Sequence, residues 1–442
     1  MLHKLDDLWL TARGIRFYRG HLAHSQYWSR PQMETYQYRC LQRLLAASAR
    51  DVPYYRRLFR EHDFDPARDF RSLQDLERLP VLTKPIARAN REQLCARSPG
   101  SRPLELRTSG STGDVFVSSV SRQHWSVEQG IVWRHWSWMG YRFRDKMAII
   151  RSYVPADGAP LWKLDRARNF FYFSAYHLTP ANAKTYLEKL AAWRPKFLRG
   201  YPSSLYILAQ MALQHGIQLS GIRGILTASE TLLPKYRRTI ESAFGARVFD
   251  WYGQAEISVT MNECDAHEGL HINSDYGYCE LLPAPELAAN ERRIVATCLH
   301  NYAMPLLRYD TGDVAILCED GHLPCSHGHT LPRIQAIRGR SDDLLYGPDG
   351  RVIPSVNLYT MMDQYSELIG FQFIQTEKTS LEVRINTHSF DAQFERRMRD
   401  DLAARFGRDL HVTILDGEDF IQSGEGKKRV IVSRVRENDR VA

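Results

Sequence analysis

The sequence predicts an α/β protein with a small α+β unit at its carboxy-terminal end. Over the first three quarters of the chain, segments with helical spacing of apolar residues alternate with short β-prone runs. That alternation is typical of α/β folds. After residues 333–354 the pattern changes to several strands and one basic helix, typical of a small α+β unit of about a hundred residues. We therefore place a domain boundary near Arg340, between residues 1–339 and 340–442.

The individual elements follow in order along the chain. Leu41, Leu44 and Leu45 recur at helical spacing, and Pro53 is expected to end their helix. The alternation continues with a helix at 181–193 and β-prone runs at 146–150, 223–228 and 246–253. The carboxy-terminal unit is predicted from the runs FQFIQT, LEVRIN and LHVTIL, with a basic helix between the last two.

Composition limits the class of protein. A chain of 442 residues exceeds what one hydrophobic core normally supports, and 43% hydrophobic with 25% charged residues is typical of globular proteins. The formal net charge is +8, but lysine and arginine are scattered and no nucleic-acid-binding motif is present. We expect no nucleic-acid partner, because an anionic small substrate accounts for the charge equally well.

The amino terminus and the cysteines indicate the compartment. Asp6 and Asp7 interrupt the apolar run that a signal peptide needs, and no segment has about 18 uninterrupted apolar residues. Seven irregularly spaced cysteines favour reduced thiols or metal ligands over a disulfide framework. We expect a cytoplasmic protein without a transmembrane segment, and the sequence leaves the oligomeric state open.

The stretch RTSGSTGDVF, residues 107–116, is rich in small residues. Glycines allow the backbone to approach a ligand closely, and hydroxyls bind phosphate oxygens. The candidate phosphate-binding residues are Ser109, Gly110, Ser111, Thr112 and Gly113. A solvated turn would have the same composition. The P-loop of nucleoside triphosphatases is excluded, because Asp114 stands where that motif requires lysine.

Five further motifs, together with this loop, resemble the nucleotide site of the adenylate-forming superfamily, which includes the acyl- and aryl-CoA synthetases. They are ILTASETL (225–232), DWYGQAE (250–256), RYDTGDVA (308–315), IRGRSDD (337–343) and GEGKKRVIVSRV (424–435). VPYYRRLF (52–59), LRGYPSSL (198–205) and the short carboxy-terminal domain most resemble the phenylacetate-CoA ligase branch, including its capsule-locus relatives. The resemblance covers nearly the whole chain. It implies a large multi-sheet adenylation domain and a small mobile α+β domain.

The resemblance implies a role for each motif at an ATP site. The small residues of the loop would hold the outer phosphates, and Glu256 would help to hold Mg²⁺. Tyr252 would lie against the adenine ring, while Asp313 and Arg340 would bind the ribose. The remaining candidate nucleotide-binding residues are Ser229, Glu230 and Gly253. Asp313 could instead stabilise a turn, and Tyr252 could belong to the core.

Lys427 is the second candidate catalytic residue. The resemblance implies that it enters from the small domain and stabilises the transition state of adenylation. A segment rich in glycine and lysine is also typical of a solvated loop. The resemblance places the hinge of the small domain near Asp342 or Asp343.

The implied reaction activates a small carboxylic acid. Adenylation replaces a hydroxide or oxide leaving group by AMP, and the acyl group then passes to a thiol, with CoA as the expected co-substrate. Transfer to an amine, or of AMP without CoA, remains an alternative. A noncatalytic nucleotide- or acyl-binding protein is a further alternative, since Ala255 and Asp114 stand where most relatives have threonine and many have lysine.

Two loops outside the nucleotide motifs contain thiolate and imidazole side chains, which structural Zn²⁺ prefers. The candidate ligands are Cys264, His271, Cys325 and His327. Some phenylacetate-CoA ligase relatives have a similar cluster with cysteine at the last place. Separate buried thiols and surface histidines would give the same sequence, and Cys318, His267 and His329 could substitute or compete.

Overall fold

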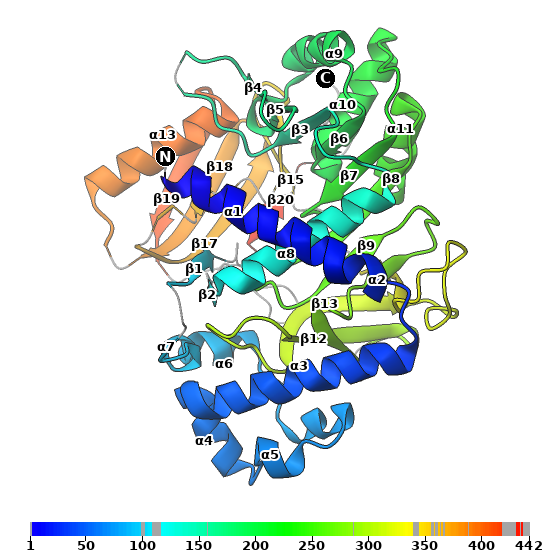
Figure 1. Ribbon diagram of the computed structural model, residues 1–442. Helices are drawn as coiled ribbons and strands as arrows, with labels where there is room; N and C mark the ends of the chain where they lie inside the picture. Colours follow the sequence, from blue (N-terminus) through cyan, green and yellow to red (C-terminus); the bar gives the residue numbers. More distant parts are fainter. Residues whose placement is uncertain are drawn as a thin grey trace. The chain divides into compact units, whose positions relative to one another are not determined.

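The structure is a computed structural model that divides the chain into two compact units. Unit 1 is formed by Met1–Arg107, Val117–Tyr141 and Phe249–Arg338, and unit 2 by Thr108–Phe116, Arg142–Val248 and Gly339–Ala442. The residues that the structure describes are 2–98, 102–107, 116–156, 158–285, 287–338, 344–354, 358, 361–362, 364–365, 367–387, 389–417, 430–433 and 435. Each unit is a mixture of helices and strands, as expected of an α/β protein (Figure 1).

Most helices of unit 1 lie in its amino-terminal part. They are α1 (Leu2–Phe17), η1 (Tyr18–Leu22), α2 (Ala23–Ser25), α3 (Arg30–Asp51), α4 (Pro53–Glu61), α5 (Pro66–Asp69), η2 (Leu73–Arg78), α6 (Lys84–Ala89), α7 (Arg91–Leu94) and α8 (Arg122–Trp138). Local sequence explains the ends of α3. Ser29 and Gln32 form a capping box at its start. Val52 precedes Pro53 and is extended, so the helix ends at Asp51 as predicted.

The strands of unit 1 form a hairpin and a larger antiparallel group. In the hairpin, β1 (Leu104–Arg107) pairs with β2 (Val117–Val120). The larger group has the order β11-β12-β13-β14-β10-β9-β8, and each neighbouring pair is antiparallel. Its strands are β8 (Val248–Gly253), β9 (Thr260–Glu263), β10 (Leu270–Ile272), β11 (Gly277–Leu282), β12 (Glu291–Cys298), β13 (Tyr309–Leu317) and β14 (Arg333–Ile337). Buried apolar side chains on β9, β10, β12 and β14 form a core under this group.

Helices α1 and α8 lie side by side in unit 1 (Figure 1), and two glycines allow their close approach. A Cβ atom at Gly14 would lie 2.6 Å from the carbonyl oxygen of Ser126. A Cβ atom at Gly130 would lie 3.0 Å from the carbonyl oxygen of Gly14. A side chain at Gly14 would therefore force the two backbones apart.

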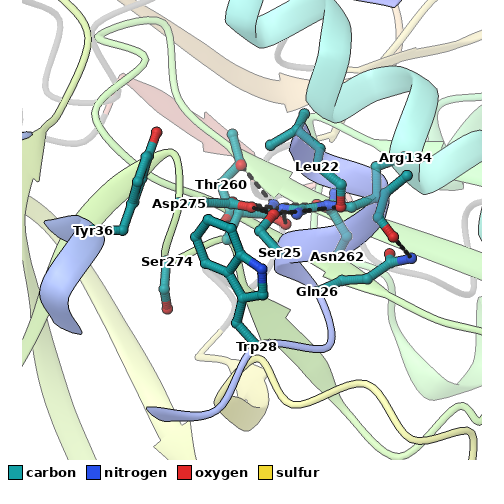
Figure 2. Close-up of polar contacts among 12 residues, drawn as sticks. Leu22, Ser25, Gln26, Trp28, Tyr36, Arg134, Thr260, Asn262, Ser274 and Asp275 are labelled. Atoms are coloured by element: carbon teal, nitrogen blue, oxygen red, sulfur yellow. Dashed lines mark hydrogen bonds and ion pairs between the residues drawn. The ribbon is translucent and has the colours of Figure 1, made fainter. Parts of the chain in front are cut away.

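A buried ion pair connects α8 to the segment that precedes β11. Arg134 donates from Nη1 to Asp275 Oδ2 at 2.6 Å and from Nη2 to Oδ1 at 2.9 Å, and neither side chain is exposed. The Ser25 hydroxyl donates to the same carboxylate at 2.5 Å (Figure 2). The side-chain oxygen of Asn273 accepts a hydrogen bond from Arg134 Nη2. Burial alone would raise the pKa of Asp275, but the Arg134 guanidinium outweighs this effect and holds the pKa below its usual range. The network therefore fixes α2 and α8 within unit 1.

Unit 2 contains a largely parallel group of strands in the order β7-β6-β3-β5-β4. Strands β7, β6, β3 and β5 are parallel, and β4 pairs antiparallel with β5. The elements are β3 (Met147–Arg151), β4 (Trp162–Asp165), β5 (Phe170–Ser174), η3 (Ala175–His177), α9 (Pro180–Trp193), β6 (Phe197–Gly200), α10 (Pro202–His215), β7 (Gly224–Ala228) and α11 (Pro234–Phe244). Helices α10 and α11 end at Gly216 and Gly245, which adopt the left-handed conformation typical of a helix C-cap.

One face of these strands packs against α9, α10 and α11. Ile150, Leu198 and Ile225 belong to this core and are fully buried. Since side chains alternate along a strand, Arg151 and Arg199 lie on the opposite face. The carboxyl ends of the parallel strands thus carry charged residues next to an apolar core.

The carboxy-terminal part of unit 2 has its own sheet and core. Its four strands have the order β19-β18-β17-β20, with β15 and β16 as a separate hairpin. The elements are β15 (Leu344–Tyr346), β16 (Val352–Pro354), β17 (Leu368–Glu377), β18 (Ser380–Thr387), α13 (Ala392–Phe406), β19 (His411–Asp416) and β20 (Ile431–Ser433). Asp391 begins α13 by accepting a hydrogen bond from the Phe394 amide at 2.7 Å. This small sheet with one long helix confirms the α+β character predicted for the region.

The other elements also agree with the sequence analysis. The helix predicted at 181–193 is α9, and the runs at 146–150, 223–228 and 246–253 are β3, β7 and β8. Within the described residues, no helix has both the length and the apolar character that a membrane span requires. Unit 1 ends at Arg338, close to the predicted boundary, but unit 2 also includes Arg142–Val248. The division into domains 1–339 and 340–442 therefore stays a prediction.

Candidate functional site

Tyr252 and Asp313 lie side by side in unit 1, although 61 residues separate them. Tyr252 is near the end of β8, and Asp313 lies within β13. The Tyr252 hydroxyl donates to Asp313 Oδ2 at 2.9 Å. Burial raises the pKa of Tyr252 far above its usual value and the Asp313 charge raises it further, so the phenol keeps the proton that it donates. The structure thus brings together two residues predicted to bind the adenosine part of a nucleotide.

Gly253 ends β8 directly beside this pair. A Cβ atom at this position would lie 2.7 Å from Trp251 Nε1. A side chain could be placed here only if the indole moved. The absence of a side chain at Gly253 therefore leaves room for the Trp251 indole, and the role of Gly253 at the nucleotide stays a prediction.

Glu256 is buried in unit 1 between a phenol and an ammonium group. The Tyr309 hydroxyl donates to Glu256 Oε1 at 2.7 Å, and Lys84 Nζ lies 3.2 Å from the same oxygen. Burial and the charge of Glu256 raise the pKa of Tyr309 above its usual value. Backbone hydrogen bonds of Leu82 to Arg308 and Asp310 hold the segment that carries Lys84 next to β13.

Lys84 was not predicted from the sequence, although a signal was present. It is the first residue of α6, where the helix dipole disfavours a cation. This position is a weak signal, and the sequence does not identify a carboxylate partner. The structure identifies it as Glu256.

Ser229 and Glu230 follow β7 in unit 2. Ser229 has a φ of +75°, which is uncommon for a residue with a side chain, and its hydroxyl accepts from Arg151 Nη2 at 2.7 Å. Glu230 Oε2 accepts from the Ser203 amide in the first turn of α10 at 3.0 Å. Burial raises the pKa of Glu230 to about 7. Arg151 was also missed; its only sequence signal is a cation directly after the apolar run MAII.

Three predicted parts of the site lie outside the described residues. These are the small-residue loop, Arg340 and Lys427. The loop residues are Ser109, Gly110, Ser111, Thr112 and Gly113. Their roles at the nucleotide stay predictions.

A cluster of two thiols and two imidazoles lies in unit 1. Its four members, Cys264, His271, Cys325 and His329, are buried, and their ligand atoms lie within 4.8 Å of one another. The two Sγ atoms are 3.9 Å apart, close to the edge of about 3.8 Å expected for a tetrahedron with Zn–S bonds of about 2.3 Å.

The environment of the cluster also fits a metal. His271 Nδ1 donates to the carbonyl of Leu331 at 2.8 Å, which leaves the lone pair of Nε2 facing Cys264 Sγ at 3.3 Å. The Ala266 amide donates to the same sulfur at 3.4 Å. The Nδ1 atom of His329 is buried, and the described part of the chain offers it no hydrogen-bond partner.

His327 is not a member of the cluster, and its prediction as the fourth ligand was wrong. Its Nδ1 atom lies 2.7 Å from Asp265 Oδ1, and its side chain is 47% exposed. The reason is a turn in which Gly328 donates to the Cys325 carbonyl and Cys325 donates to the carbonyl of His329. The turn carries His327 outward and returns His329 to the side of Cys325.

Comparison with known proteins finds one family model and several relatives that are similar in sequence to this chain. Residues 345–434 match the family model of the CapK C-terminal domain. Protein CapK from Staphylococcus aureus is 24% identical over 381 residues, which are 83% of this chain and 82% of that protein. Phenylacetate-coenzyme A ligase from Thermus thermophilus is 28% identical over 343 residues, 75% of this chain and 74% of that protein. Over 69–83% of its length the chain is similar to phenylacetate-CoA ligases and to CapK, as its resemblance to the phenylacetate-CoA ligase-like branch of the adenylate-forming superfamily predicts.

A solved structure supports the fold that this resemblance implies. The crystal structure is that of 2-hydroxyisobutyryl-CoA ligase in complex with 2-HIB-AMP and CoA in the thioesterification state. It matches with a TM-score of 0.60 and 21% identity over 93% of each chain. The fold therefore does not depend on any single motif, whereas the roles of the site residues stay predictions.

Proposed function

We propose that this protein activates a carboxylic acid with ATP and transfers the acyl group to a thiol, CoA being the expected one. The carboxylate oxygen forms a bond to the α-phosphorus of ATP, and pyrophosphate leaves. The thiol sulfur then forms a bond to the acyl carbon and loses its proton, and AMP leaves. The superfamily, and relatives that are named CoA ligases, support this reaction class at the general level.

The hydrogen bond between Tyr252 and Asp313 is the observation that carries the proposal. Two motifs distant in sequence meet at the carboxyl end of β8, with an aromatic ring and a carboxylate in contact. An aromatic ring can stack on adenine, and a carboxylate can accept from two ribose hydroxyls. The pair therefore has the chemistry that adenosine requires. Arg340 is proposed to contact the same ribose.

The phosphates need positive charge and hydrogen-bond donors during the reaction. We assign Ser109–Gly113 to the outer phosphates and Lys427 to the charge that develops in adenylation. Glu256 fits Mg²⁺ only together with nucleotide phosphates, because its carboxylate already faces the ammonium group of Lys84. Mg²⁺ bound there would neutralise phosphate charge. Ser229 and Glu230 are proposed to line the nucleotide from unit 2.

The two half-reactions require different groups at the acyl phosphate. We propose that domain 340–442 rotates about a hinge near Asp342 or Asp343 between adenylation and thioester formation. The hinge would remove Lys427 once the adenylate has formed and admit the thiol. Crystals with an adenylate and with a CoA analogue should contain two arrangements, and one rigid arrangement in both would contradict the hinge.

The cysteine–histidine cluster is proposed to be a structural Zn²⁺ site. Two thiolates and two imidazoles complete a tetrahedron, which leaves no position for a substrate. The helix end at Trp138 packs on it, since the Trp138 ring stacks on His329 at 4.9 Å. The metal would therefore tie two loops to α8.

Pyrophosphate exchange with a panel of carboxylic acids tests the proposed function. Exchange with at least one acid, and AMP release that depends on CoA, are the expected results. AMP release without CoA would favour an amide-forming or AMP-transferring enzyme. No exchange with any acid would favour a noncatalytic binder, for which Ala255 and Asp114 provide a reason, because one phosphate-binding hydroxyl and one cation are missing.

A further inference from the structure

The carboxyl edge of the parallel strands in unit 2 holds a guanidinium that uses only part of its hydrogen-bonding capacity on residues that the structure describes. Strands β3, β6 and β7 end level with one another, because Ile150 pairs with Gly200 and Gly200 pairs with Thr227. Arg151 is the residue at the end of β3. Ligands of open α/β sheets bind outside the carboxyl ends of the strands. Arg151 therefore stands where the fold class presents its ligand-binding groups.

The contacts of Arg151 orient it without neutralising it. Within the described ranges its partners are the Ser229 hydroxyl, 2.7 Å from Nη2, and the Tyr201 ring, whose centre lies 4.8 Å from the guanidinium carbon. Neither of these two direct contacts is a salt bridge, although the charge of Glu230 also acts on Arg151. A guanidinium has five N–H donors, so several remain for another acceptor. The flat ring below and the hydroxyl beside it fix the direction in which those donors point.

The conformation of Ser229 also favours a ligand-binding role. Its φ of +75° places a residue with a side chain in the left-handed region. Such conformations persist where the surrounding structure imposes them, and they are concentrated at functional sites. Here the conformation presents the hydroxyl to Arg151.

The charges around Arg151 leave this edge positive. Arg199 lies on the same face of the strands; burial lowers its pKa to about 9 and the Arg151 charge lowers it further, so it is still a cation at neutral pH. Glu230 is the carboxyl group that interacts with Arg151, and burial raises its pKa to about 7. It is thus only partly ionised at neutral pH. The charge of Arg199 thus adds to that of Arg151, and Glu230 offsets the two charges only in part.

We propose that Arg151 binds an anionic oxygen of a substrate at the carboxyl edge of β3, β6 and β7. This inference rests on the proposed function and adds a specificity-determining residue to it. A guanidinium held flat on an aromatic ring is suited to bind a carboxylate or phosphate through two parallel hydrogen bonds. The anionic oxygen can belong to a second acidic group of the carboxylic acid or to a phosphate of ATP or CoA, and the test separates these sources.

The test measures binding to the full chain by calorimetry. The probes are ATP, CoA, phenylacetate and 4-carboxyphenylacetate; the two acids differ only in a second carboxylate. Wild type is compared with Arg151→Met, which keeps the apolar stem, and with Arg151→Lys, which keeps the charge. The matched control is Arg166→Met, because Arg166 is exposed in the turn after β4 of the same unit.

Arg151→Met should raise the dissociation constant of one probe about tenfold to hundredfold, as expected for one charge-assisted interaction. If 4-carboxyphenylacetate alone is affected, the anion is a second acidic group of the acid. If ATP or CoA alone is affected, the anion is a phosphate. Arg151→Lys should recover part of the loss, and Arg166→Met should bind like wild type.

Equal affinities of wild type and Arg151→Met for every probe would overturn the inference, as would a wild type that binds none of them. Pyrophosphate exchange distinguishes this result from failure of the proposed function. Exchange that proceeds equally well in Arg151→Met would reject the role of Arg151 and keep the enzyme. Weakened ATP binding in a protein without exchange would keep the role of Arg151 and reject the enzyme.

Discussion

Arg134 in unit 1 and Arg151 in unit 2 are both arginines, but their burial and their partners differ. Arg134 is fully buried and donates to both oxygens of the buried Asp275 (Figure 2). Arg151 lies at a strand end, and its partners in the described chain are a hydroxyl and an aromatic ring. The charge of Arg134 is neutralised by Asp275 within the fold, whereas the charge of Arg151 is proposed to bind a substrate anion.

Burial and the presence of a carboxylate partner distinguish an arginine that stabilises the fold from one that is available to bind a ligand. A buried charge without a partner is costly, so Arg134 and Asp275 depend on each other for their burial. A charge at the carboxyl edge of parallel strands keeps contact with solvent and needs no carboxylate partner. Loss of the first should therefore affect stability, and loss of the second should affect binding.

Arg134→Met should give the largest loss of stability. It leaves Asp275 buried without its cation, which costs about 3–5 kcal/mol of unfolding free energy. Urea unfolding of Arg134→Met and of Arg151→Met measures the contrast, and Arg151→Met should lie within about 0.5 kcal/mol of wild type. An equal loss in both variants would remove the distinction between the two arginines.

A second variant separates the charge from the packing. In the double variant Arg134→Met, Asp275→Asn, the uncompensated carboxylate is gone, so part of the lost stability should return. If the double variant is as unstable as Arg134→Met, the loss came from packing and not from the ion pair.

Lys427→Ala extends the comparison to a residue that is predicted to stabilise the transition state of adenylation and to contribute little to the stability of the fold. Adenylation should slow by a few orders of magnitude, as expected for the loss of about 3–4 kcal/mol of transition-state stabilisation. The melting temperature and the thioester half-reaction, started from a synthetic acyl-adenylate, should change little. Lys428→Ala is the control, and loss of adenylation in that variant alone would move the assignment by one residue.

The double variant Cys264→Ser, Cys325→Ser tests the proposed zinc site, whose role is to stabilise the fold and not to react with a substrate. Zinc should fall from about one ion per chain to almost none, with a loss of about 2 kcal/mol in unfolding free energy. Elemental analysis and urea unfolding measure both. Cys40→Ser, Cys298→Ser changes two buried cysteines outside the cluster and should keep its zinc. Full metal retention in the first variant would exclude the site.

Much of the fold was predictable because it follows from local patterns. The period of apolar residues located α9, β3, β7 and β8, and Pro53 located the end of α3. The ordered motifs identified the superfamily. The grouping of residues 142–248 with the carboxy-terminal part was not predicted, because contacts between distant segments leave no local pattern in the sequence.

The candidate site was predictable in its residue types and less so in its geometry. Tyr252 and Asp313 were assigned to one nucleotide, and they are hydrogen-bonded. The choice of His327 over His329 failed because spacing alone does not reveal the direction in which a turn presents each side chain. Lys84 and Arg151 were missed because their partners, Glu256 and Ser229, are distant in sequence.

The stability of the two regions should also depend on pH with opposite signs. Burial raises the pKa of Glu230 from 4.5 to about 7 in the folded protein. Between these values the folded state binds more protons than the unfolded state, so the contribution of Glu230 to stability falls as the pH rises and is lost above about pH 7. Asp275 has a folded pKa below 3.8, so its contribution is lost as the pH falls.

Glu230→Gln mimics the protonated carboxyl and should remove this loss. Its amide oxygen can still accept from the Ser203 amide, which Glu230 Oε2 contacts at 3.0 Å. Relative to wild type, the variant should therefore be more stable at pH 8 than at pH 5, by urea unfolding at both values. Glu188→Gln, at an exposed position of α9, should follow the wild-type profile. Parallel profiles of Glu230→Gln and wild type would mean that the folded protein holds this carboxyl ionised, and Arg151 would then face a full negative charge.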